Sequence, residues 1–432
     1  MKYTIVGTGA RHHMFRKAIT ETYGDTSELL GICDNNAKRL ALSASQIKDQ
    51  HGNGIATYDA ENFDTMLAEQ KPDTVVVTVP DYMHHEYIIR ALRAGCNVMT
   101  EKPMTTNLTK LKAILDAQAE TGKSVTVTFN YRYTPARTQI KEILQSGVIG
   151  DITAVDFRWH LDRVHGADYF RRWHRYKEKS GGLLVHKSTH HFDLLNWWIG
   201  STPKTVNAIG KLDFYTPATA ERLGLSDHGE RCHTCKLTEK CDFVLDIEDD
   251  ELLRELYLES EDADGYYRDR CIWDQDITIE DTMQVQVQYA NDVSLNYTLC
   301  AYSPWEGVEV KFHGTKGELT HRHVEVHGVF GGKRDMTNRD SMETTVHVAG
   351  QPPENIDVWA GEGDHGGADP VMLGYLFDAE TVGDDPYARG STHVDGAWSI
   401  LTGIAANASM AANQVTDVDK MLADQGIKLQ RL

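Results

Sequence analysis

Short apolar runs recur through the first 130 residues, and stretches with apolar residues at helical spacing separate them. The runs predict buried strands at 3–6, 29–33, 74–79, 97–99 and 124–129. The stretches between them predict helices at 36–50, 59–70, 82–94 and 108–121. Strands that are apolar on both faces and alternate with helices are typical of a doubly wound α/β domain with a parallel sheet.

From about residue 150 the pattern changes to a partial alternation of apolar and polar positions. It predicts strands at 151–159, 205–214, 282–289, 293–299, 308–313 and 344–348. These strands lack regular intervening helices, which favours a largely antiparallel sheet in an α+β domain. Helical patterns remain at 190–199, 370–378 and 394–413. We therefore expect one domain at 1–130 and a second at 131–432, with an insertion at about 216–275.

The composition fits a chain that folds on its own hydrophobic core, since 41% of its 432 residues are hydrophobic and 25% are charged. The net charge of −20 disfavours nucleic acid and anionic membrane surfaces as partners. No run of about 18 apolar residues predicts a transmembrane helix, and the first residues resemble a strand instead of a signal peptide. Seven dispersed cysteines do not resemble a disulfide framework, so we expect a cytoplasmic protein.

A glycine turn follows the first predicted strand. The backbone at Gly7, Gly9 and Ala10 can approach a pyrophosphate at a helix N-terminus, although the third glycine of the full dinucleotide fingerprint is missing. Asp34 ends the second predicted strand, where an acid can hydrogen-bond ribose hydroxyls, and Asn35 follows it. An acid there favours NAD over NADP because it would repel a 2′-phosphate. A plain tight turn is the alternative interpretation of the glycines alone.

Four further segments occur together in one known family. They are Pro80-Asp81-Tyr82-Met83-His84, Glu101-Lys102-Pro103, Phe129-Asn130-Tyr131-Arg132 and the segment from Gly181 to Asp193. In this order after a glycine turn, they resemble the Gfo/Idh/MocA oxidoreductases, the glucose–fructose oxidoreductase and inositol dehydrogenase family. Any one segment alone would be a weak signal, but together they span nearly the whole chain.

The resemblance implies an N-terminal Rossmann domain and a C-terminal α+β domain with a large, open, mainly antiparallel sheet. It implies an NAD(P)-dependent oxidoreductase that transfers hydride between nicotinamide and a secondary hydroxyl or ketone of a sugar, a cyclitol or a derivative. It also implies a homo-oligomer, a dimer or tetramer, that assembles through the C-terminal sheet. The cofactor-binding positions carried over from these segments are Pro80, His84, Glu101 and Lys102.

By the same resemblance, Lys102 and His190 belong beside the reacting alcohol. Oxidation of a secondary carbinol needs a group that takes the hydroxyl proton. An imidazole exchanges a proton readily near pH 7, whereas an ordinary lysine, with a pKa of about 10.4, does not. Our hypothesis is that His190 is the principal acid/base and that Lys102 orients and polarises the oxygen. The reverse assignment stays open.

The histidine-rich segment departs from the family pattern at its centre. His186 stands where the family usually has aspartate, Ser188 stands where it usually has glycine, and Lys187 lies between them. We therefore add His186 to the catalytic candidates. The candidates for substrate binding are Lys102, Tyr131, Arg132, Lys187 and His190.

The extra nitrogen bases at His186 and Lys187 keep a second enzymatic interpretation open. Oxidation at a ring carbon acidifies the neighbouring C–H, so elimination and re-reduction would cleave a glycoside with no net redox change. A third interpretation is a non-catalytic, NAD-sensing regulatory protein on the same scaffold. The presence of both Lys102 and His190 argues against it.

Three cysteines of the insertion are closely spaced: Cys232 and Cys235 form a C-x-x-C pair, and Cys241 follows. With Cys271 they can complete a Cys₄ zinc site that holds an acidic, loop-rich excursion together. The spacing also occurs in some iron–sulfur sites. Reduced, unpaired thiols are the remaining interpretation for a cytoplasmic protein.

Overall fold

The computed structural model describes residues 1–432 except 48–53, 326–339, 363 and 379–382. The chain forms two compact units. Unit 1 contains residues 1–138, 251–266 and 361–400, and unit 2 contains residues 139–250, 267–360 and 401–432. Within the described ranges, none of the helices has the length and apolar character needed to cross a membrane.

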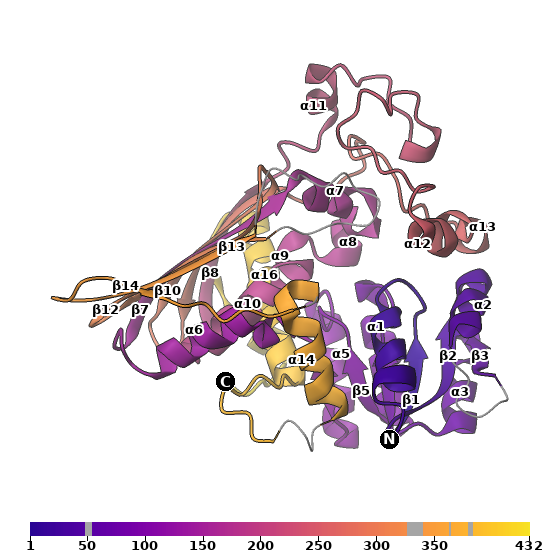
Figure 1. The fold of residues 1–432 in the computed structure, drawn as a ribbon, viewed down its shortest axis with the longest axis horizontal. Coiled ribbons are helices and arrows are strands. Elements are labelled where there is room, and N and C mark those ends of the chain that lie inside the picture. Colours follow the sequence, from indigo (N-terminus) through magenta and orange to yellow (C-terminus); the bar gives the residue numbers. More distant parts are fainter. Residues whose placement is uncertain (48–53, 326–339, 363, 379–382) are drawn as a thin grey trace. The chain divides into compact units, whose positions relative to one another are not determined.

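Unit 1 is built on a six-stranded parallel sheet with the strand order β3-β2-β1-β4-β5-β6 (Figure 1). Its strands are β1 (Lys2–Val6), β2 (Glu28–Asp34), β3 (Ala56–Asp59), β4 (Thr74–Val77), β5 (Asn97–Thr100) and β6 (Val125–Val127). The strand order reverses direction between β1 and β4, which is where doubly wound sheets bind their ligands. The predicted doubly wound domain is confirmed.

Helices pack on this sheet with buried aromatic residues. They are α1 (His12–Lys17), α2 (Ala37–Gln46), α3 (Phe63–Gln70), α4 (His84–Arg93), α5 (Leu108–Thr121) and α14 (Asp364–Phe377). One buried cluster joins Tyr3 of β1 to Phe15 and to Phe377 of α14, and the Tyr3 and Phe377 ring centroids lie 5.3 Å apart. On α3 and α4, Phe63 and Tyr87 meet edge to face at 4.9 Å. A helix from the last quarter of the chain therefore completes the core of the N-terminal sheet.

Unit 2 is built on a nine-stranded sheet with the order β14-β13-β12-β11-β7-β10-β9-β8-β15. Its strands are β7 (Ile152–Asp162), β8 (Pro203–Lys211), β9 (Thr282–Tyr289), β10 (Ser294–Ser303), β11 (Glu306–Gly314), β12 (Gly317–Glu325), β13 (Ser341–Val348), β14 (Glu354–Ile356) and β15 (Thr416–Asp417). Only β7 and β10 pair in parallel among these neighbours. The predicted α+β domain with a mainly antiparallel sheet is confirmed.

One face of this sheet is covered and the other is polar. On β9, Val285 and Val287 are buried, whereas Gln284 and Gln286 on the opposite face are exposed. The helices of unit 2 are α7 (Arg163–Arg171), α8 (Lys177–Ser180), α9 (Leu183–His186), α10 (Thr189–Ile199), α11 (Pro217–Arg222) and α17 (Val418–Asp424). Two helices, α6 (Pro135–Gln145) and α16 (His393–Ala412), run from residues of unit 1 into residues of unit 2. All of α10 is buried, including its polar residues.

The insertion is divided between the units. Residues 251–266 belong with unit 1, and the rest of the insertion belongs with unit 2. In unit 2, Phe214, Tyr215, Phe243 and Trp273 form an aromatic cluster, with the Phe243 and Trp273 centroids 5.3 Å apart. Phe243 and Trp273 of the insertion thus pack against two aromatic residues that precede it.

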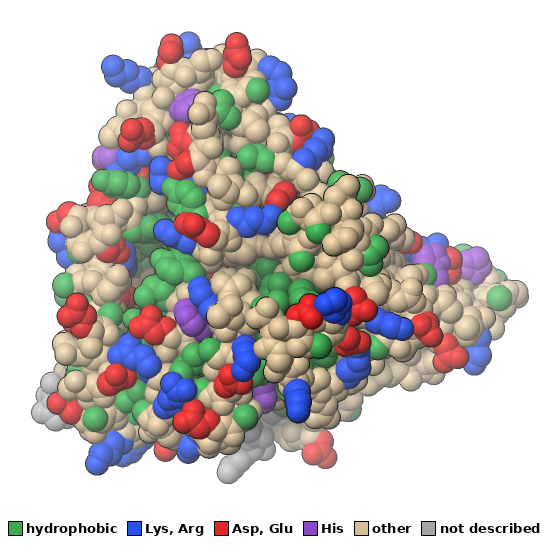
Figure 2. Space-filling model, turned by 180° about the vertical axis from the view of Figure 1, so that it is seen from behind, with side chains coloured by type: hydrophobic (Ala, Val, Ile, Leu, Met, Phe, Trp, Pro, Cys, Tyr) green, Lys and Arg blue, Asp and Glu red, His purple; other side chains and the backbone are tan. Residues whose placement is uncertain are grey.

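The surface mixes charges of both signs. Figure 2 shows acidic and basic side chains interspersed over one face of the molecule. Among the described residues on that face, lysines and arginines do not gather into a continuous stripe.

Candidate active site

The turn after β1 requires glycine. Gly7 has φ +93°, and a Cβ there would lie 2.7 Å from the carbonyl carbon of Thr78. The Thr78 hydroxyl donates a hydrogen bond of 2.7 Å to the Gly7 carbonyl, which fixes the turn against the end of β4. Gly9 and Ala10 follow and lead into α1. The backbone therefore has the close approach that a pyrophosphate-binding loop needs.

Asp34 ends β2 beside this turn, and its side chain is buried. Its Oδ2 accepts hydrogen bonds from the Thr8 N–H (2.5 Å) and the Thr8 hydroxyl (3.0 Å). Its Oδ1 accepts a hydrogen bond from the Asn36 N–H (2.7 Å), while Asn35 is exposed. These contacts hold a carboxylate at the carboxyl edge of the sheet.

Two cations that follow β2 are paired with acids of the insertion. Lys38 Nζ lies 2.7 Å from an oxygen of Asp262, and the pair is exposed. Arg39 forms an ion pair with Asp264, and both side chains are largely buried. The acids come from α13 (Glu261–Asp264). The acidic run of the insertion therefore neutralises the positive charges nearest to Asp34 in the sequence.

The same part of the insertion reaches the glycine turn. A π-helical turn (Arg254–Leu258) carries Tyr257, whose hydroxyl oxygen lies 3.4 Å from the Ala10 nitrogen. A Cβ on Gly9 would lie 3.7 Å from that hydroxyl. The Asn36 amide also donates a hydrogen bond of 2.8 Å to the Ser260 carbonyl. Segment 251–266 thus borders the candidate pyrophosphate position.

This donor set fits a dinucleotide. The glycine turn supplies a cradle that a Cβ at Gly7 would fill, and backbone N–H groups at a helix N-terminus. Asp34 supplies carboxylate oxygens for ribose hydroxyls.

Glu101 is the centre of a buried polar network at the end of β5. Its carboxylate accepts hydrogen bonds from Arg11 Nε (2.7 Å), the Thr128 hydroxyl (3.1 Å) and the Lys102 N–H (3.3 Å). Arg11 also lies 3.4 Å from Asp369. Burial alone would lower the pKa of Arg11, but Glu101 and Asp369 raise it, so the guanidinium stays charged. The network fixes the backbone that carries the Lys102 side chain.

His84 connects two loops at the same edge of the sheet. Its Nδ1 lies 2.8 Å from the Pro103 carbonyl oxygen, and its Nε2 lies 2.8 Å from the Val79 carbonyl oxygen. Pro80 follows Val79 and precedes a short 3₁₀ turn that leads into α4. His84 and Pro80 therefore help to fix the conformation of the loops after β4 and β5.

Tyr131 and Arg132 are both buried after β6. The Arg132 guanidinium lies 2.9 Å from Asp395. The guanidinium carbon of Arg137 lies 4.1 Å from the centre of the Tyr131 ring. Both predicted substrate residues therefore have partners inside unit 1.

In unit 2, His186 lies at the end of α9 among aromatic rings, and it is 7% exposed. Its ring centroid is 4.1 Å from that of His174, 5.4 Å from that of Tyr169 and 5.9 Å from that of Trp173. Gly181, with φ +71°, allows the sharp turn before α9, because a Cβ there would lie 2.8 Å from Val185. The result is a buried cluster of ring faces and imidazole nitrogens.

A hydrogen-bonded chain in which half-buried His165 joins buried Glu306 to buried Tyr169 adjoins this cluster. His165 Nδ1 lies 3.0 Å from Glu306 Oε1, and His165 Nε2 lies 3.0 Å from the Tyr169 hydroxyl. Burial alone would raise the pKa of Glu306, but His165 and Lys187 lower it, so the carboxylate stays ionised. Lys187 Nζ lies 4.9 Å from the centre of the Trp159 ring. We call Glu306, His165 and Tyr169 the relay.

The residues after Lys187 begin α10 on the buried face of the sheet. Ser188 Oγ and His191 Nδ1 lie 2.7 and 2.8 Å from the Tyr297 hydroxyl, and the His191 ring stacks on Trp159 at 4.3 Å. His191 is therefore part of the packing between α10 and the sheet. His190, its buried neighbour, is directed to another side of the helix because successive helical residues are rotated by about 100°.

Two family models match the chain. The model described as the oxidoreductase family with an NAD-binding Rossmann fold matches residues 1–129, and the model of the oxidoreductase family C-terminal alpha/beta domain matches residues 141–417. The chain belongs to the Gfo/Idh/MocA oxidoreductase family. This membership confirms the resemblance carried by the sequence segments, and it establishes an oxidoreductase with an NAD-binding Rossmann domain.

Relatives within the Gfo/Idh/MocA family differ in how much of the chain they share. YteT of Bacillus subtilis (strain 168), named as an oxidoreductase, is 34% identical over 430 residues, which are 96% of each chain. The D-glucoside 3-dehydrogenase of Escherichia coli (strain K12) is 27% identical over 209 residues, or 48% of this chain and 57% of that protein. The structure of aldose-aldose oxidoreductase from Caulobacter crescentus, complexed with glycerol, has the same fold, with a TM-score of 0.63 at 16% identity over 96% of this chain and 99% of that one.

Sequence reasoning did not anticipate several parts of this Gfo/Idh/MocA site. Arg11 and Glu306 belong to no local motif, and Glu306 is 141 residues from His165. Segment 251–266 lies in an acidic insertion whose composition suggests a solvated loop. The sequence offers one indication that this segment contacts the residues after β2, namely opposite charges in the two segments. Opposite charges are too common in sequences to predict a contact.

Proposed function

We propose that the protein is an NAD-dependent dehydrogenase that acts on a secondary hydroxyl of a sugar, a cyclitol or a derivative. The observation that carries this proposal is the buried cluster around His186. Its ring faces and convergent polar groups suit a compact polyhydroxylated ring. Relatives that are a D-glucoside 3-dehydrogenase and an inositol 2-dehydrogenase support the same substrate class.

The preference for NAD follows from the charges after β2. Asp34 offers oxygens to a ribose diol and repels a phosphate at the 2′ position. Arg39 is the cation best placed in the sequence to receive that phosphate, but Asp264 neutralises it. The remaining cofactor contacts are assigned to the backbone at Gly7, Gly9 and Ala10, with Asn35, Pro80, His84 and Glu101 in the surrounding loops.

In the proposed reaction the substrate loses two hydrogens, one as a hydride and one as a proton. When bound, the nicotinamide accepts the hydride from the carbinol carbon. Lys102 donates a hydrogen bond to the substrate oxygen, and His190 takes the hydroxyl proton as the carbonyl forms. The products are a ketone, NADH and one proton, and the reverse reaction returns both hydrogens.

The other predicted residues are given supporting roles. His186 and Lys187 bind neighbouring hydroxyls, and the relay orients the Tyr169 hydroxyl toward the same cluster. Tyr131 and Arg132 position the loop after β6, because Arg137 and Asp395 engage their side chains inside unit 1.

The test is to incubate the purified protein with NAD and a panel of sugars, cyclitols and aryl glycosides, and to follow NADH by absorbance. NADH that appears in proportion to a ketone product supports the proposal. Tight NADH binding with no turnover of any compound would instead indicate a regulatory protein that senses the cofactor. NADP that is used faster than NAD would contradict the cofactor assignment.

A second candidate is glycoside cleavage by transient oxidation, elimination and re-reduction. The observation that favours it is the relay, which supplies a proton-transfer chain in addition to the Lys102 and His190 pair. Elimination needs such a base, because the C–H next to the new carbonyl must lose its proton while the glycosidic oxygen leaves. Cleavage of an aryl glycoside that requires NAD but accumulates no NADH would favour this candidate over net oxidation.

We further propose that the protein is cytoplasmic and forms a dimer or tetramer through the polar face of the nine-stranded sheet. Exposed Gln284 and Gln286 lie on this face. Light scattering during gel filtration measures the assembly, and a charge such as Gln286→Glu should weaken it. A monomeric wild-type protein at micromolar concentration would contradict the proposal.

A further inference from the structure

The structure brings four cysteines of the insertion together in unit 2. We define the cysteine cluster as Cys232, Cys235, Cys241 and Cys271. The first two flank a 3₁₀ turn, and a short antiparallel pairing brings Cys271 beside them. In that pairing the N–H groups of Cys232 and Cys271 donate hydrogen bonds of 2.9 and 2.8 Å to carbonyls of the opposite segment. All four thiols are free of disulfides.

The cysteine cluster lines a single cavity of about 30 Å³. This volume has room for roughly two or three water-sized spheres. The rest of the wall includes the aromatic residues Phe243 and Trp273, and its other polar members are Arg171, His228, Arg231 and Thr238. A mostly apolar cavity whose wall contains four thiols favours a ligand that prefers sulfur to water.

Two of the four sulfur atoms, those of Cys232 and Cys235, each accept two N–H hydrogen bonds. Cys232 Sγ accepts hydrogen bonds from Arg171 Nη1 (3.2 Å) and the Leu245 N–H (3.5 Å). Cys235 Sγ accepts hydrogen bonds from the N–H groups of Gly229 and Leu237, both at 3.4 Å. A thiol is a weak acceptor, whereas a metal-bound thiolate is stabilised by such donors. These donors therefore suit the charged form of sulfur at Cys232 and Cys235.

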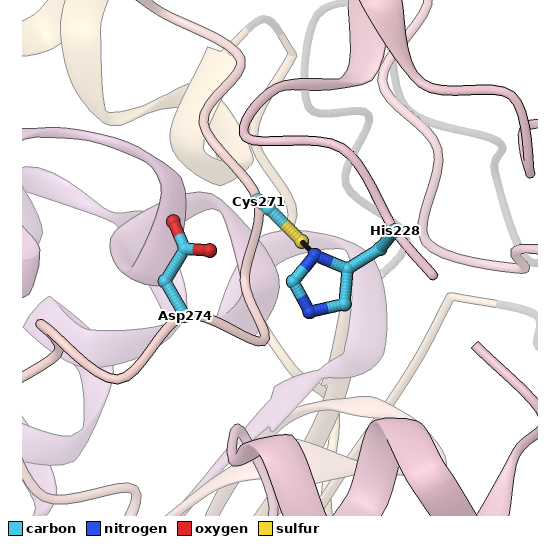
Figure 3. A group of neighbouring side chains, drawn as sticks. All are labelled: His228, Cys271 and Asp274. Atoms are coloured by element: carbon cyan, nitrogen blue, oxygen red, sulfur yellow. Dashed lines mark hydrogen bonds between the residues drawn. The ribbon is translucent and has the colours of Figure 1, made fainter. Parts of the chain in front are cut away.

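We propose that the cysteine cluster binds a metal centre in this cavity through four thiolates, and that the centre is an iron–sulfur cluster. A single zinc ion, with Zn–S bonds of about 2.3 Å, draws its thiolates to about 3.8 Å from one another. Among the described residues, the set of three candidate ligand atoms that lies within 4.8 Å consists of His228, Cys271 and Asp274 (Figure 3). That set contains one thiol, so no three sulfur atoms of the cysteine cluster lie within 4.8 Å of one another, although all four cysteines line the cavity.

The set of His228, Cys271 and Asp274 is itself a poor site for a metal ion. Asp274 Oδ2 lies 3.1 Å from Nη2 of the buried Arg175, so a cation already engages its carboxylate. The ring of His228 is directed at Cys271, with Nδ1 3.3 Å from Sγ (Figure 3). This contact places His228 as a hydrogen-bonding neighbour of a ligand. An iron–sulfur cluster takes one thiolate at each of its outer iron atoms, which matches thiols arranged around a cavity.

The test is to purify the full chain without oxygen and without chelator, and to measure iron, acid-labile sulfide and zinc per chain. Iron and sulfide in equal amounts, with a broad visible absorption that reductant bleaches, are the expected result. Zinc in equal amount to the chain would keep the ligand set but overturn the iron–sulfur form. Absence of both metals, even after reconstitution with iron and sulfide, would overturn the site.

Variants assign the ligands. Cys232→Ser and Cys271→Ser should each lose most of the bound metal, whereas Cys300→Ser, a control thiol on β10 outside the cavity wall, should retain it. Alkylation of the wild-type protein avoids any dependence on the folding of variants. The cysteine cluster should resist alkylation until the centre is removed oxidatively with a chelator, and equal reactivity before and after removal would contradict the proposal. None of these measurements uses turnover, so their failure is separate from failure of the dehydrogenase proposal.

Discussion

The candidate cofactor residues of unit 1 and the candidate substrate residues of unit 2 are brought together in different ways. In unit 1, Gly7 and Asp34 lie at the carboxyl ends of paired parallel strands, so the sheet topology alone brings them together. In unit 2, His165, His186 and Glu306 come from α7, α9 and β11 and meet only because those elements pack together. Substitutions in unit 1 should therefore change cofactor binding, and those in unit 2 should change substrate turnover or stability.

Lys102 tests this comparison most severely, because it follows a strand of unit 1 yet is assigned to the substrate. Lys102→Ala should lower kcat by about 10²–10⁴-fold, the range for loss of a group that acts on the transferred proton or its oxygen. NADH binding, measured by fluorescence titration, should weaken far less than kcat falls, although Lys102 is also a predicted cofactor-binding position. Lys112→Ala removes an exposed lysine of α5 and serves as the control. Near-normal turnover of Lys102→Ala would remove this residue from the mechanism.

Asp168 tests the stability of the substrate side, because it lies in α7 with His165 and Tyr169. Its carboxylate is buried and lies 2.6 Å from Arg268 and 3.3 Å from Arg172. Burial alone would raise the pKa of Asp168, but the arginines lower it from 3.8 to about 2. A lowered folded-state pKa stabilises the protein above the ordinary value, and this stabilisation is lost as the pH falls through the folded value. The shift corresponds to about 2 kcal/mol.

Asp168→Asn should therefore lower the free energy of unfolding at neutral pH by about 2 kcal/mol or more and flatten its decline between about pH 4 and pH 2. Tryptophan fluorescence is a suitable probe, since every tryptophan except Trp398 lies in unit 2. Asp116→Asn, which breaks an exposed ion pair, is the control. If the variant keeps the acid dependence of the wild-type protein, the buried ion pairs do not stabilise this unit.

Asp264 tests the cofactor side. Asp264→Asn leaves the shape of α13 but frees the positive charge of Arg39, which can then receive a 2′-phosphate. The ratio of kcat/KM for NADP to that for NAD should rise about tenfold, as expected for about 1.4 kcal/mol of new attraction. Asp262→Asn, at the exposed pair with Lys38, should shift the ratio less. An unchanged ratio in Asp264→Asn would mean that Asp34 alone sets the preference.

The two sides also differ in how far the sequence predicts them. Continuous apolar runs identify β1, β2, β4, β5 and β6, and the glycine turn and Asp34 then follow from strand order. By contrast, β3 has the residues Ala-Thr-Tyr-Asp and alternates between half-buried and exposed positions, so no apolar run marks it. Likewise, β12 contains polar residues at most positions because it lies near the edge of the open sheet. Local patterns thus detect strands that carry a continuous apolar run or a clear apolar–polar alternation, and they miss strands that carry neither.

The remaining parts of the site could not be predicted because they depend on contacts between residues that are far apart in the sequence. Histidine spacing identifies the segment from His186 to His190, but the partners of that segment come from distant parts of the chain. Glu306 meets His165 across the pairing of β7 with β11, and no property of either residue alone indicates this. The composition of the acidic segment 251–266 predicts a solvated loop. Its contact with the glycine turn depends on how the segment and the turn fold. Such contacts are visible only in three dimensions.

Tyr257 makes the weakest of these contacts and gives the smallest expected effect. Its ring is 8% exposed, so Tyr257→Phe keeps the packing and removes only a hydroxyl that lies 3.4 Å from the Ala10 nitrogen. The Ala10 N–H is a group that a pyrophosphate would use, so loss of the competing hydroxyl should tighten NADH binding about two- to threefold, or about 0.5 kcal/mol. Fluorescence titration measures this, with Tyr267→Phe, an exposed tyrosine of unit 2, as the control. Weaker binding would instead show that the hydroxyl contacts the cofactor, and the insertion would then be part of the nucleotide site.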